Sequence, residues 1–179
     1  MATNSSPPCK VILRSKDGVE LYTIPERPTD PVEKPAERPF LLKGATTLCQ
    51  INATTAYLHM AGKGIAKCPL TDPPFENVKD VFFENTENVQ MMDLSPKGTY
   101  LLTWERWYED KRPDNLRLWE TATGRLAASF TQKALKREAW PNLQFTADEA
   151  FAALHVTSEV RFFPAAAFSE GYVFGIWAQ

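Results

Sequence analysis

Residues 91–104 read MMDLSPKGTYLLTW. An apolar segment that ends at Leu94 is followed by Ser-Pro-Lys-Gly, a sequence typical of a tight turn, and then by a second apolar segment. Similar stretches stand before it, CQINATTAYLH at residues 49–59, and after it, QFTADEAFAAL at residues 144–154. One strand–turn–strand unit therefore occurs three times in a chain of 179 residues.

The three copies align on their first apolar residue, at spacings of 43 and 51 residues (Ile51, Leu94 and Phe145). The middle copy carries about seven extra residues in a charged loop, residues 105–115, and without them the second spacing is close to the first. In each copy an aromatic residue stands six positions further on (Tyr57, Tyr100 and Phe151). A repeat of about 43 residues with several short strands has the length of one propeller blade.

We therefore predict an all-β fold, a partial WD40-like β-propeller of about three blades of antiparallel strands. A β-sandwich with coincidental spacing is the alternative. The blades are expected within residues 41–168, divided as 41–88, 89–135 and 136–168. The other expected segments, in chain order, are a disordered N-terminus (1–10), a hairpin or pair of outer strands (11–24), a proline-rich connector (25–40) and a divergent tail (169–179).

Composition excludes several classes of protein. The net charge of −2 does not favour general attraction to nucleic acid, so any RNA contact must be local. Apolar runs are shorter than the ~18 residues of a membrane span, and the N-terminus lacks the apolar core of a signal peptide. We expect a cytoplasmic protein with no membrane contact. Cys9, Cys49 and Cys68 have no metal-ligand spacing and are expected to be reduced.

The sequence contains no recognisable catalytic constellation, so we predict that the protein is not an enzyme and has no metal or cofactor. His59 and His155 fall in expected strands, where a histidine is more often packed or hydrogen-bonded than a base. The segment AGKGIAK, residues 61–67, lacks the phosphate-loop pattern and is better interpreted as a hairpin turn.

Two stretches are candidates for binding. The loop at residues 105–114 combines aromatic and cationic side chains that could stack on an RNA base or lie against a ribosomal protein (Arg106, Trp107, Tyr108, Lys111 and Arg112). A second cationic stretch could contact RNA phosphate (Lys133, Lys136 and Arg137). The competing interpretations are that the two aromatic rings pack back on their own blade and that the second stretch is a solvated connector.

The segment from Tyr100 to Phe168 resembles the N-terminal propeller of eukaryotic translation initiation factor 2A. The shared features, in order, are the L-x-T-W strand, the N-L-x-L strand after a charged loop, the turn that ends T-G, the S-F-x-Q-K segment, the W-x-x-x-x-F segment before D-E, and the E-V-x-F-F strand. The resemblance implies a cytosolic, non-enzymatic protein with a nine-bladed propeller. It also implies binding to the 40S ribosomal subunit and support for the delivery of initiator methionyl-tRNA.

The chain departs from this family in length. Nine blades would need on the order of 400 residues at about 43 each, so we expect a truncated form. The family's charged extension, which contacts tRNA and mRNA, has no counterpart, so those partners are expected less strongly than the 40S subunit. An open sector of blades would also expose sheet faces and edges, which invites pairing with a partner. A general WD-repeat scaffold for protein–protein contacts is the alternative function.

Overall fold

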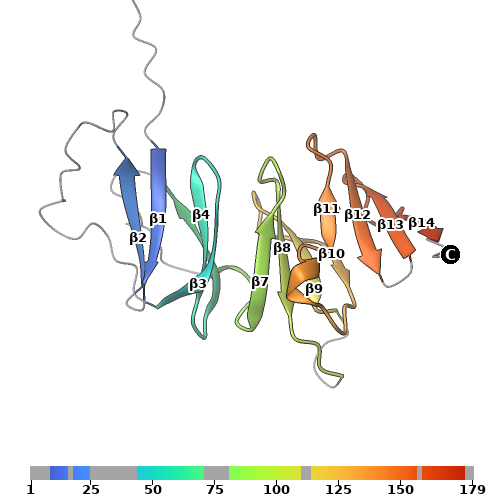
Figure 1. Ribbon diagram of the computed structural model, residues 1–179, viewed down its shortest axis with the longest axis horizontal. Coiled ribbons are helices and arrows are strands. Elements are labelled where there is room, and N and C mark those ends of the chain that lie inside the picture. The colour runs from blue at the N-terminus through green and yellow to red at the C-terminus, as the bar shows by residue number, and fades with distance from the viewer. Residues whose placement is uncertain are drawn as a thin grey trace, which may run out of the picture.

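Three four-stranded antiparallel sheets stand side by side in chain order, and a two-stranded hairpin stands beside the first of them (Figure 1). The structure is a computed structural model that describes residues 9–15, 18–24, 44–70, 81–109, 114–156 and 159–175. In every sheet each strand pairs with the next strand of the chain. The predicted all-β fold of about three blade-like units is confirmed.

The strands have the following bounds. The hairpin consists of β1 (Cys9–Ser15) and β2 (Gly18–Ile24). Sheet 1 consists of β3 (Ala45–Ile51), β4 (Thr55–Met60), β5 (Gly64–Pro69) and β6 (Val81–Phe83). Sheet 2 consists of β7 (Val89–Leu94), β8 (Tyr100–Glu105), β9 (Leu116–Glu120) and β10 (Leu126–Phe130). Sheet 3 consists of β11 (Leu143–Phe145), β12 (Phe151–Val156), β13 (Glu159–Pro164) and β14 (Tyr172–Gly175).

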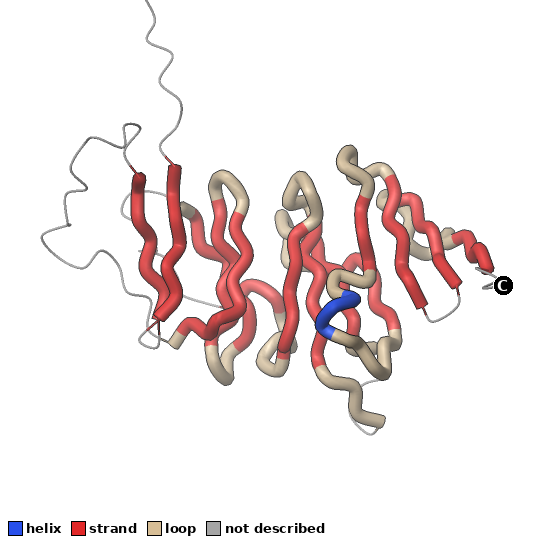
Figure 2. The backbone as a smooth tube through the Cα atoms, in the orientation of Figure 1, coloured by secondary structure: helices blue, strands red, loops and turns tan. Residues whose placement is uncertain are grey.

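Helix is almost absent from the described residues. A single 3-10 turn, η1 (Arg137–Ala139), lies in the connection between β10 and β11 (Figure 2). Strand β1 begins at Cys9, inside the stretch expected to be a disordered N-terminus, whereas the proline-rich connector at residues 25–40 lies outside the described residues. The expected tail, residues 169–179, contributes β14 to sheet 3, because Tyr-Val-Phe-Gly is a short run of strand-forming residues.

The repeat found in the sequence corresponds to equivalent places in the three sheets. Ile51, Leu94 and Phe145 each end the first strand of a sheet. The aromatic residues aligned six positions later are not all equivalent. Ile51 pairs with a residue five positions on, whereas Leu94 and Phe145 pair with residues seven positions on, so the turn in sheet 1 is two residues shorter. Tyr57 is therefore out of register with Tyr100 and Phe151, and the residue equivalent to them is Thr55.

The turn of the opening motif is closed by hydrogen bonds. The Gly98 amide donates to the Ser95 carbonyl at 2.8 Å, and the Tyr100 amide donates to the Ser95 hydroxyl at 2.9 Å. Gly98 has φ +76°, and a Cβ there would lie 2.8 Å from the side-chain nitrogen of Asn52. A side chain at this position would be both strained and obstructed, which explains the glycine.

Each strand alternates its side chains between the two faces of its sheet. Leu101 faces sheet 1 and Leu102 faces sheet 3. The core between sheets 1 and 2 contains Tyr57, Ile65, Phe83, Val89, Met92, Leu101 and Trp119. The core between sheets 2 and 3 contains Leu102, Trp104, Leu116, Leu118, Leu143, Ala152, Leu154 and Phe163. The remaining face of sheet 1 is covered by the hairpin, through the fully buried Val19.

Several polar side chains inside sheets 1 and 2 are paired. The Trp119 indole nitrogen donates to the Thr103 hydroxyl at 2.8 Å across strands β9 and β8. The Arg117 guanidinium forms a buried ion pair with Glu105 and donates to the Asn85 carbonyl at 2.8 Å. Lys67 of sheet 1 donates to the Thr121 carbonyl of sheet 2 at 2.7 Å. Sheets 1 and 2 are thus joined by directional bonds as well as by apolar burial.

Candidate binding surface

The two candidate loops lie together at one end of sheet 2. One connects β8 to β9 and the other connects β10 to β11. The Asn115 side chain joins them: its nitrogen donates to the Glu105 and Gln132 carbonyls at 2.8 Å each, and its oxygen accepts from the Gln132 amide at 2.7 Å. Asn115 is 2% exposed, so these bonds form out of water, where they constrain the loops most strongly.

Trp107 and Lys133, which are 26 residues apart in the sequence, meet on this end. The Lys133 ammonium lies 4.6 Å from the centroid of the Trp107 ring. Trp107 is half-buried, and its indole nitrogen is buried without an acceptor among the described residues. The ring therefore packs back on the protein and offers a platform for a cation rather than an open stacking face.

Tyr108 has the opposite character. Its side chain is 47% exposed, and the Arg106 guanidinium lies 5.8 Å from its ring centroid. Arg106 is itself exposed. An aromatic ring and a guanidinium that both face solvent can stack on a nucleic-acid base or on a protein side chain.

The other predicted cations divide into two groups. Lys136 and Arg137 are exposed at the start of η1. Lys111 and Arg112 lie outside the described residues. Two of the neighbouring acids are already engaged, because Glu105 pairs with Arg117 and Asp114 accepts from the Ser129 hydroxyl at 2.9 Å. Glu109 and Glu138 remain exposed beside the cations. We call Arg106, Trp107, Tyr108, Lys133, Lys136 and Arg137 the basic–aromatic surface.

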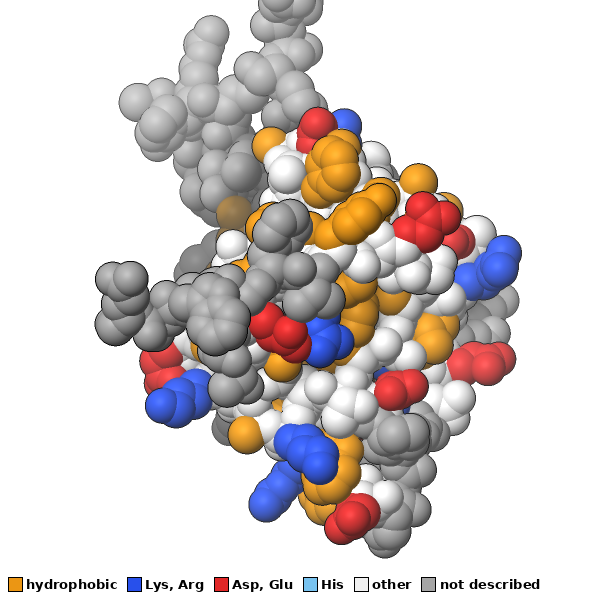
Figure 3. Space-filling view, turned by 90° about the vertical axis from the view of Figure 1, so that its right-hand side faces the viewer, with side chains coloured by type: hydrophobic (Ala, Val, Ile, Leu, Met, Phe, Trp, Pro, Cys, Tyr) orange, Lys and Arg blue, Asp and Glu red, His pale blue; other side chains and the backbone are white. Residues whose placement is uncertain are grey.

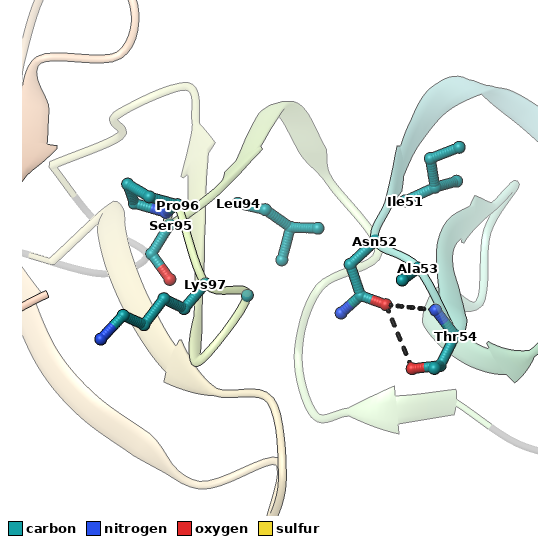
Figure 4. Close-up of a pocket in the computed structure, with 9 residues that line it drawn as sticks. Ile51, Asn52, Ala53, Thr54, Leu94, Ser95, Pro96 and Lys97 are labelled. Atoms are coloured by element: carbon teal, nitrogen blue, oxygen red, sulfur yellow. Dashed lines mark hydrogen bonds between the residues drawn. The ribbon is translucent and has the colours of Figure 1, made fainter. Parts of the chain in front are cut away.

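A shallow pocket of about 450 Å³ lies at the opposite end of the sheets, between the β3–β4 and β7–β8 turns (Figure 4). The Asn52 side-chain oxygen accepts from the Thr54 amide at 3.0 Å, so it stabilises its own turn. The Lys97 side chain points away from Asn52. The groups that line the pocket do not converge on one point, so it has no evident ligand.

Among the described side chains, His59, Cys49 and Cys68 have packing and bonding that do not suit a catalytic role. His59 is buried and bonded through both ring nitrogens, to the Thr46 hydroxyl at 3.0 Å and the Glu87 carbonyl at 3.1 Å. Burial raises the pKa of the Cys49 thiol to about 11 and that of Cys68 to about 12, so both are poor nucleophiles. The described residues contain no group of three or more His, Cys, Asp or Glu that could hold a metal ion, and no helix long and apolar enough to cross a membrane.

The sequence did not reveal the residues that organise the surface. Asn115 was seen only as the first residue of the N-L-x-L strand, and Gln132 only as part of a cationic stretch. Their pairing spans two loops, and no spacing rule connects loop residues across a strand pair. An asparagine placed directly before a buried strand is the one signal that could have pointed to it.

Comparison with known proteins agrees with the resemblance seen in the sequence. No protein family model matches the chain. Over 89 residues it is 42% identical to eukaryotic translation initiation factor 2A of Schizosaccharomyces pombe, a match that covers 47% of this chain and 15% of that protein. Over 80 residues it is 36% identical to eukaryotic translation initiation factor 2A of Dictyostelium discoideum, covering 44% of this chain and 13% of that protein. The chain is therefore homologous to this factor over about half of its own length, and the match spans a small part of the relatives.

Solved structures extend the match over nearly the whole chain. The crystal structure of a eukaryotic initiation factor superposes with a TM-score of 0.63 at 25% identity, covering 96% of this chain and 41% of that one. Kluyveromyces lactis Hsv2p superposes with a TM-score of 0.55 at 14% identity, covering 87% of this chain and 46% of that one. The second likeness shows the fold alone. In both comparisons this chain spans less than half of the solved chain.

Proposed function

We propose that the protein acts in translation initiation as a factor of the 2A type, binding the 40S ribosomal subunit in the cytoplasm without catalysing a reaction. The observation that supports this most directly is the 42% identity to eukaryotic translation initiation factor 2A over 89 residues. In this proposal the sheets serve as a scaffold, and the basic–aromatic surface makes the contact with ribosomal RNA. Support for the delivery of initiator methionyl-tRNA is proposed from the same homology.

The geometry supports an RNA contact at this end of sheet 2. Arg106 and Tyr108 face solvent side by side, and Lys136 and Arg137 are exposed on the neighbouring connection. Bases stack on aromatic and guanidinium planes, while lysine and arginine neutralise phosphates. The net charge of −2 means that attraction depends on this local group rather than on the whole molecule.

Sedimentation of the chain with purified 40S subunits at graded salt tests the proposal. We expect co-migration at low salt that declines as salt rises, because each neutralised phosphate releases a counterion. Replacing Arg106, Tyr108, Lys136 and Arg137 together by alanine should abolish co-migration and flatten the salt dependence. The matched control replaces Lys97 and Arg125, exposed cations at the other end of the sheets, and should leave binding unchanged.

Three outcomes would contradict parts of the proposal. No co-migration of the unchanged chain at low salt would contradict ribosome binding. Binding that is equally weakened by the control would contradict the role of the basic–aromatic surface. Partners that persist after nuclease treatment and contain no ribosomal protein would favour the general scaffold instead.

A further inference from the structure

Sheet 3 has one face packed on sheet 2 and one face that no other described sheet covers. On β12, Ala152 and Leu154 face sheet 2, so the intervening Ala153 points the other way. The pairing register carries the same face across the sheet, from Gln144 through Ala153 and Phe162 to Tyr172. Figure 3 looks onto this end of the molecule and shows hydrophobic side chains in its upper part and near its centre, where an acidic and a basic side chain lie beside them.

Large apolar side chains on this face are accessible to solvent. Phe151 is 53% exposed, Phe162 is 40% exposed and Tyr172 is 64% exposed. By contrast, the residue of sheet 2 equivalent to Phe162 is Leu118, which is completely buried against sheet 3. Exposed apolar groups gathered on one sheet face indicate an interaction surface rather than ordinary surface scatter.

The chemistry of the face favours an uncharged protein surface as its partner. The described side chains that the register places on it are Gln144, Phe151, Ala153, His155, Val160, Phe162, Pro164 and Tyr172. None of these is a lysine, arginine, aspartate or glutamate. RNA and anionic lipid surfaces are recognised through cations, so neither suits this group of residues. Two copies of the face could meet without opposing like charges.

The size of the side chains changes across the sheet. In the row that crosses all four strands, β11 and β12 contribute Gln144 and Ala153, and β13 and β14 contribute Phe162 and Tyr172. The side chains therefore project little from the sheet at Ala153 and far from it at Phe162. A complementary surface needs bulk where this one is low and space where this one is high.

A second copy supplies that complement. A twofold axis that runs parallel to the strands, between β12 and β13, lays β11 and β12 of one copy over β14 and β13 of the other. Phe162 then lies over Ala153 of the second copy, and Tyr172 lies over its Gln144, whose amide can bond the phenol. Phe151 lies over Pro164 in the same way. Each contact occurs twice, as an isologous interface requires.

We propose that two copies of this chain associate face to face through sheet 3, in this register. The two sheets form a sandwich in which the alanine of one copy accommodates the phenylalanine of the other. The proposal is independent of ribosome binding, because the basic–aromatic surface belongs to loops at one end of sheet 2 and not to this face.

Sedimentation velocity of the full chain over a range of concentrations is the first test. We expect a monomer–dimer equilibrium for the unchanged chain and a dissociation constant raised at least about tenfold in Phe162→Asp, because a buried charge would face Ala153 of the partner. The matched control is Leu126→Asp, since Leu126 is 49% exposed on β10, away from this face, and should leave the dimer intact. Circular dichroism and thermal melting confirm that both variants fold.

Cysteine cross-linking tests the register. In a Cys9→Ser background, the double variant Gln144→Cys with Tyr172→Cys should form an intermolecular disulfide, because the axis places these positions opposite each other. Tyr172→Cys alone should not cross-link, because position 172 of the second copy lies at the opposite edge of the interface. Cross-linking by Tyr172→Cys alone would mean that β14 of one copy lies over β14 of the other, which overturns the register.

Two further results would overturn the proposal as a whole. One is a chain that stays monomeric at all concentrations. The other is association that Leu13→Asp abolishes: Leu13 is 50% exposed on the hairpin at the far end of the molecule, so its involvement would indicate head-to-tail stacking.

Discussion

Sheets 2 and 3 have the same strand order but different surroundings. Sheet 2 lies between two other sheets, and four of the six residues of β8 are buried. Among the described residues, sheet 3 has another sheet against one face only, and two of the six residues of β12 are buried. Leu118 and Phe162 occupy equivalent positions, yet they are 0% and 40% exposed.

The sequence of each sheet reflects this difference. The strand YLLTWE of sheet 2 is nearly continuous in apolar residues, because both faces need side chains that exclude water. The equivalent strand of sheet 3, FAALHV, has Ala153 where sheet 2 has Leu102 and His155 where sheet 2 has Trp104. A blade covered on both faces is thus distinguished from a partly covered one by its middle strands.

The largest difference in stability is expected from the two ion pairs. Arg117 pairs with Glu105 inside sheet 2, where the side chains are 7% and 12% exposed. Arg161 pairs with Glu159 in sheet 3 at 2.6 Å, where they are 41% and 32% exposed. Arg117→Met should lower the free energy of unfolding by about 3–5 kcal/mol, because the buried Glu105 carboxylate loses the guanidinium that it pairs with. Arg161→Met should lower it by less than about 1 kcal/mol.

Urea unfolding followed by circular dichroism measures both values. The double variant Arg117→Met with Glu105→Gln is the control, because it also removes the buried negative charge that Arg117 neutralises, and it should recover part of the loss. Equal losses in the two single variants would show that the pair in sheet 3 is as buried as the pair in sheet 2.

The next largest difference is expected from the equivalent apolar residues. Leu118→Ala should lower the free energy of unfolding by about 2–5 kcal/mol, because it leaves a cavity between sheets 2 and 3. Phe162→Ala should cost less than about 1 kcal/mol in dilute protein, because the ring is already partly in water. Thermal and urea unfolding at low protein concentration compare the two, and the cost of Phe162→Ala should rise with concentration if the proposed dimer forms.

The sequence predicted the positions of the strands well and their boundaries less well. Repeated turns after Ile51, Leu94 and Phe145 marked the first strand pair of each sheet, because turn chemistry and apolar runs are local properties. Tyr57 was misaligned because the β3–β4 turn is two residues shorter than the others. Strand β14 was missed because the family resemblance ended at Phe168 and no repeat signal replaced it.

The candidate surface was predicted by residue type but not by arrangement. Arg106 and Tyr108 are neighbours in the chain, so their joint exposure follows from a single loop. The approach of Lys133 to Trp107 depends on how two loops fold around Asn115. That arrangement comes from tertiary hydrogen bonds between segments far apart in the chain, which composition and spacing do not encode.

A smaller effect on stability is expected at the hydrogen bond between the β11–β12 turn of sheet 3 and the β7–β8 turn of sheet 2. The buried carboxylate of Glu149 accepts from the Lys97 amide at 2.5 Å. Burial acts to raise the pKa of this carboxyl, but hydrogen bonds from Ser95, Thr99 and the Lys97 amide outweigh it and hold the pKa below its ordinary value. The folded state therefore favours the charged form, so this contribution is present above the ordinary carboxyl pKa and is lost as pH falls through the folded value.

Glu149→Gln should lower the free energy of unfolding at pH 7 by about 1–2 kcal/mol, because a neutral amide makes weaker bonds to the same donors. Unfolding measured from pH 7 down to pH 3 should show the difference between the variant and the unchanged chain shrinking as pH falls. Glu170→Gln, at an exposed position in the connection between β13 and β14, is the control and should match the unchanged chain throughout. A difference that grows toward low pH would contradict the lowered pKa.

The smallest effect on stability is expected from removing one tyrosine hydroxyl group on each face of sheet 3. On the covered face, Tyr100 of sheet 2 stacks on Phe145 with ring centroids 5.3 Å apart and donates from its hydroxyl to the Ala165 carbonyl at 3.0 Å. Tyr100→Phe keeps the stacking and removes the bond, so it should cost about 1 kcal/mol. Tyr172→Phe, on the uncovered face, should change stability by less than about 0.5 kcal/mol in dilute protein. Urea unfolding of both variants under identical conditions measures the two costs. A cost for Tyr172→Phe as large as that for Tyr100→Phe would mean that the monomer already buries this face of sheet 3. Sheets 2 and 3 would then not differ in how their faces are covered.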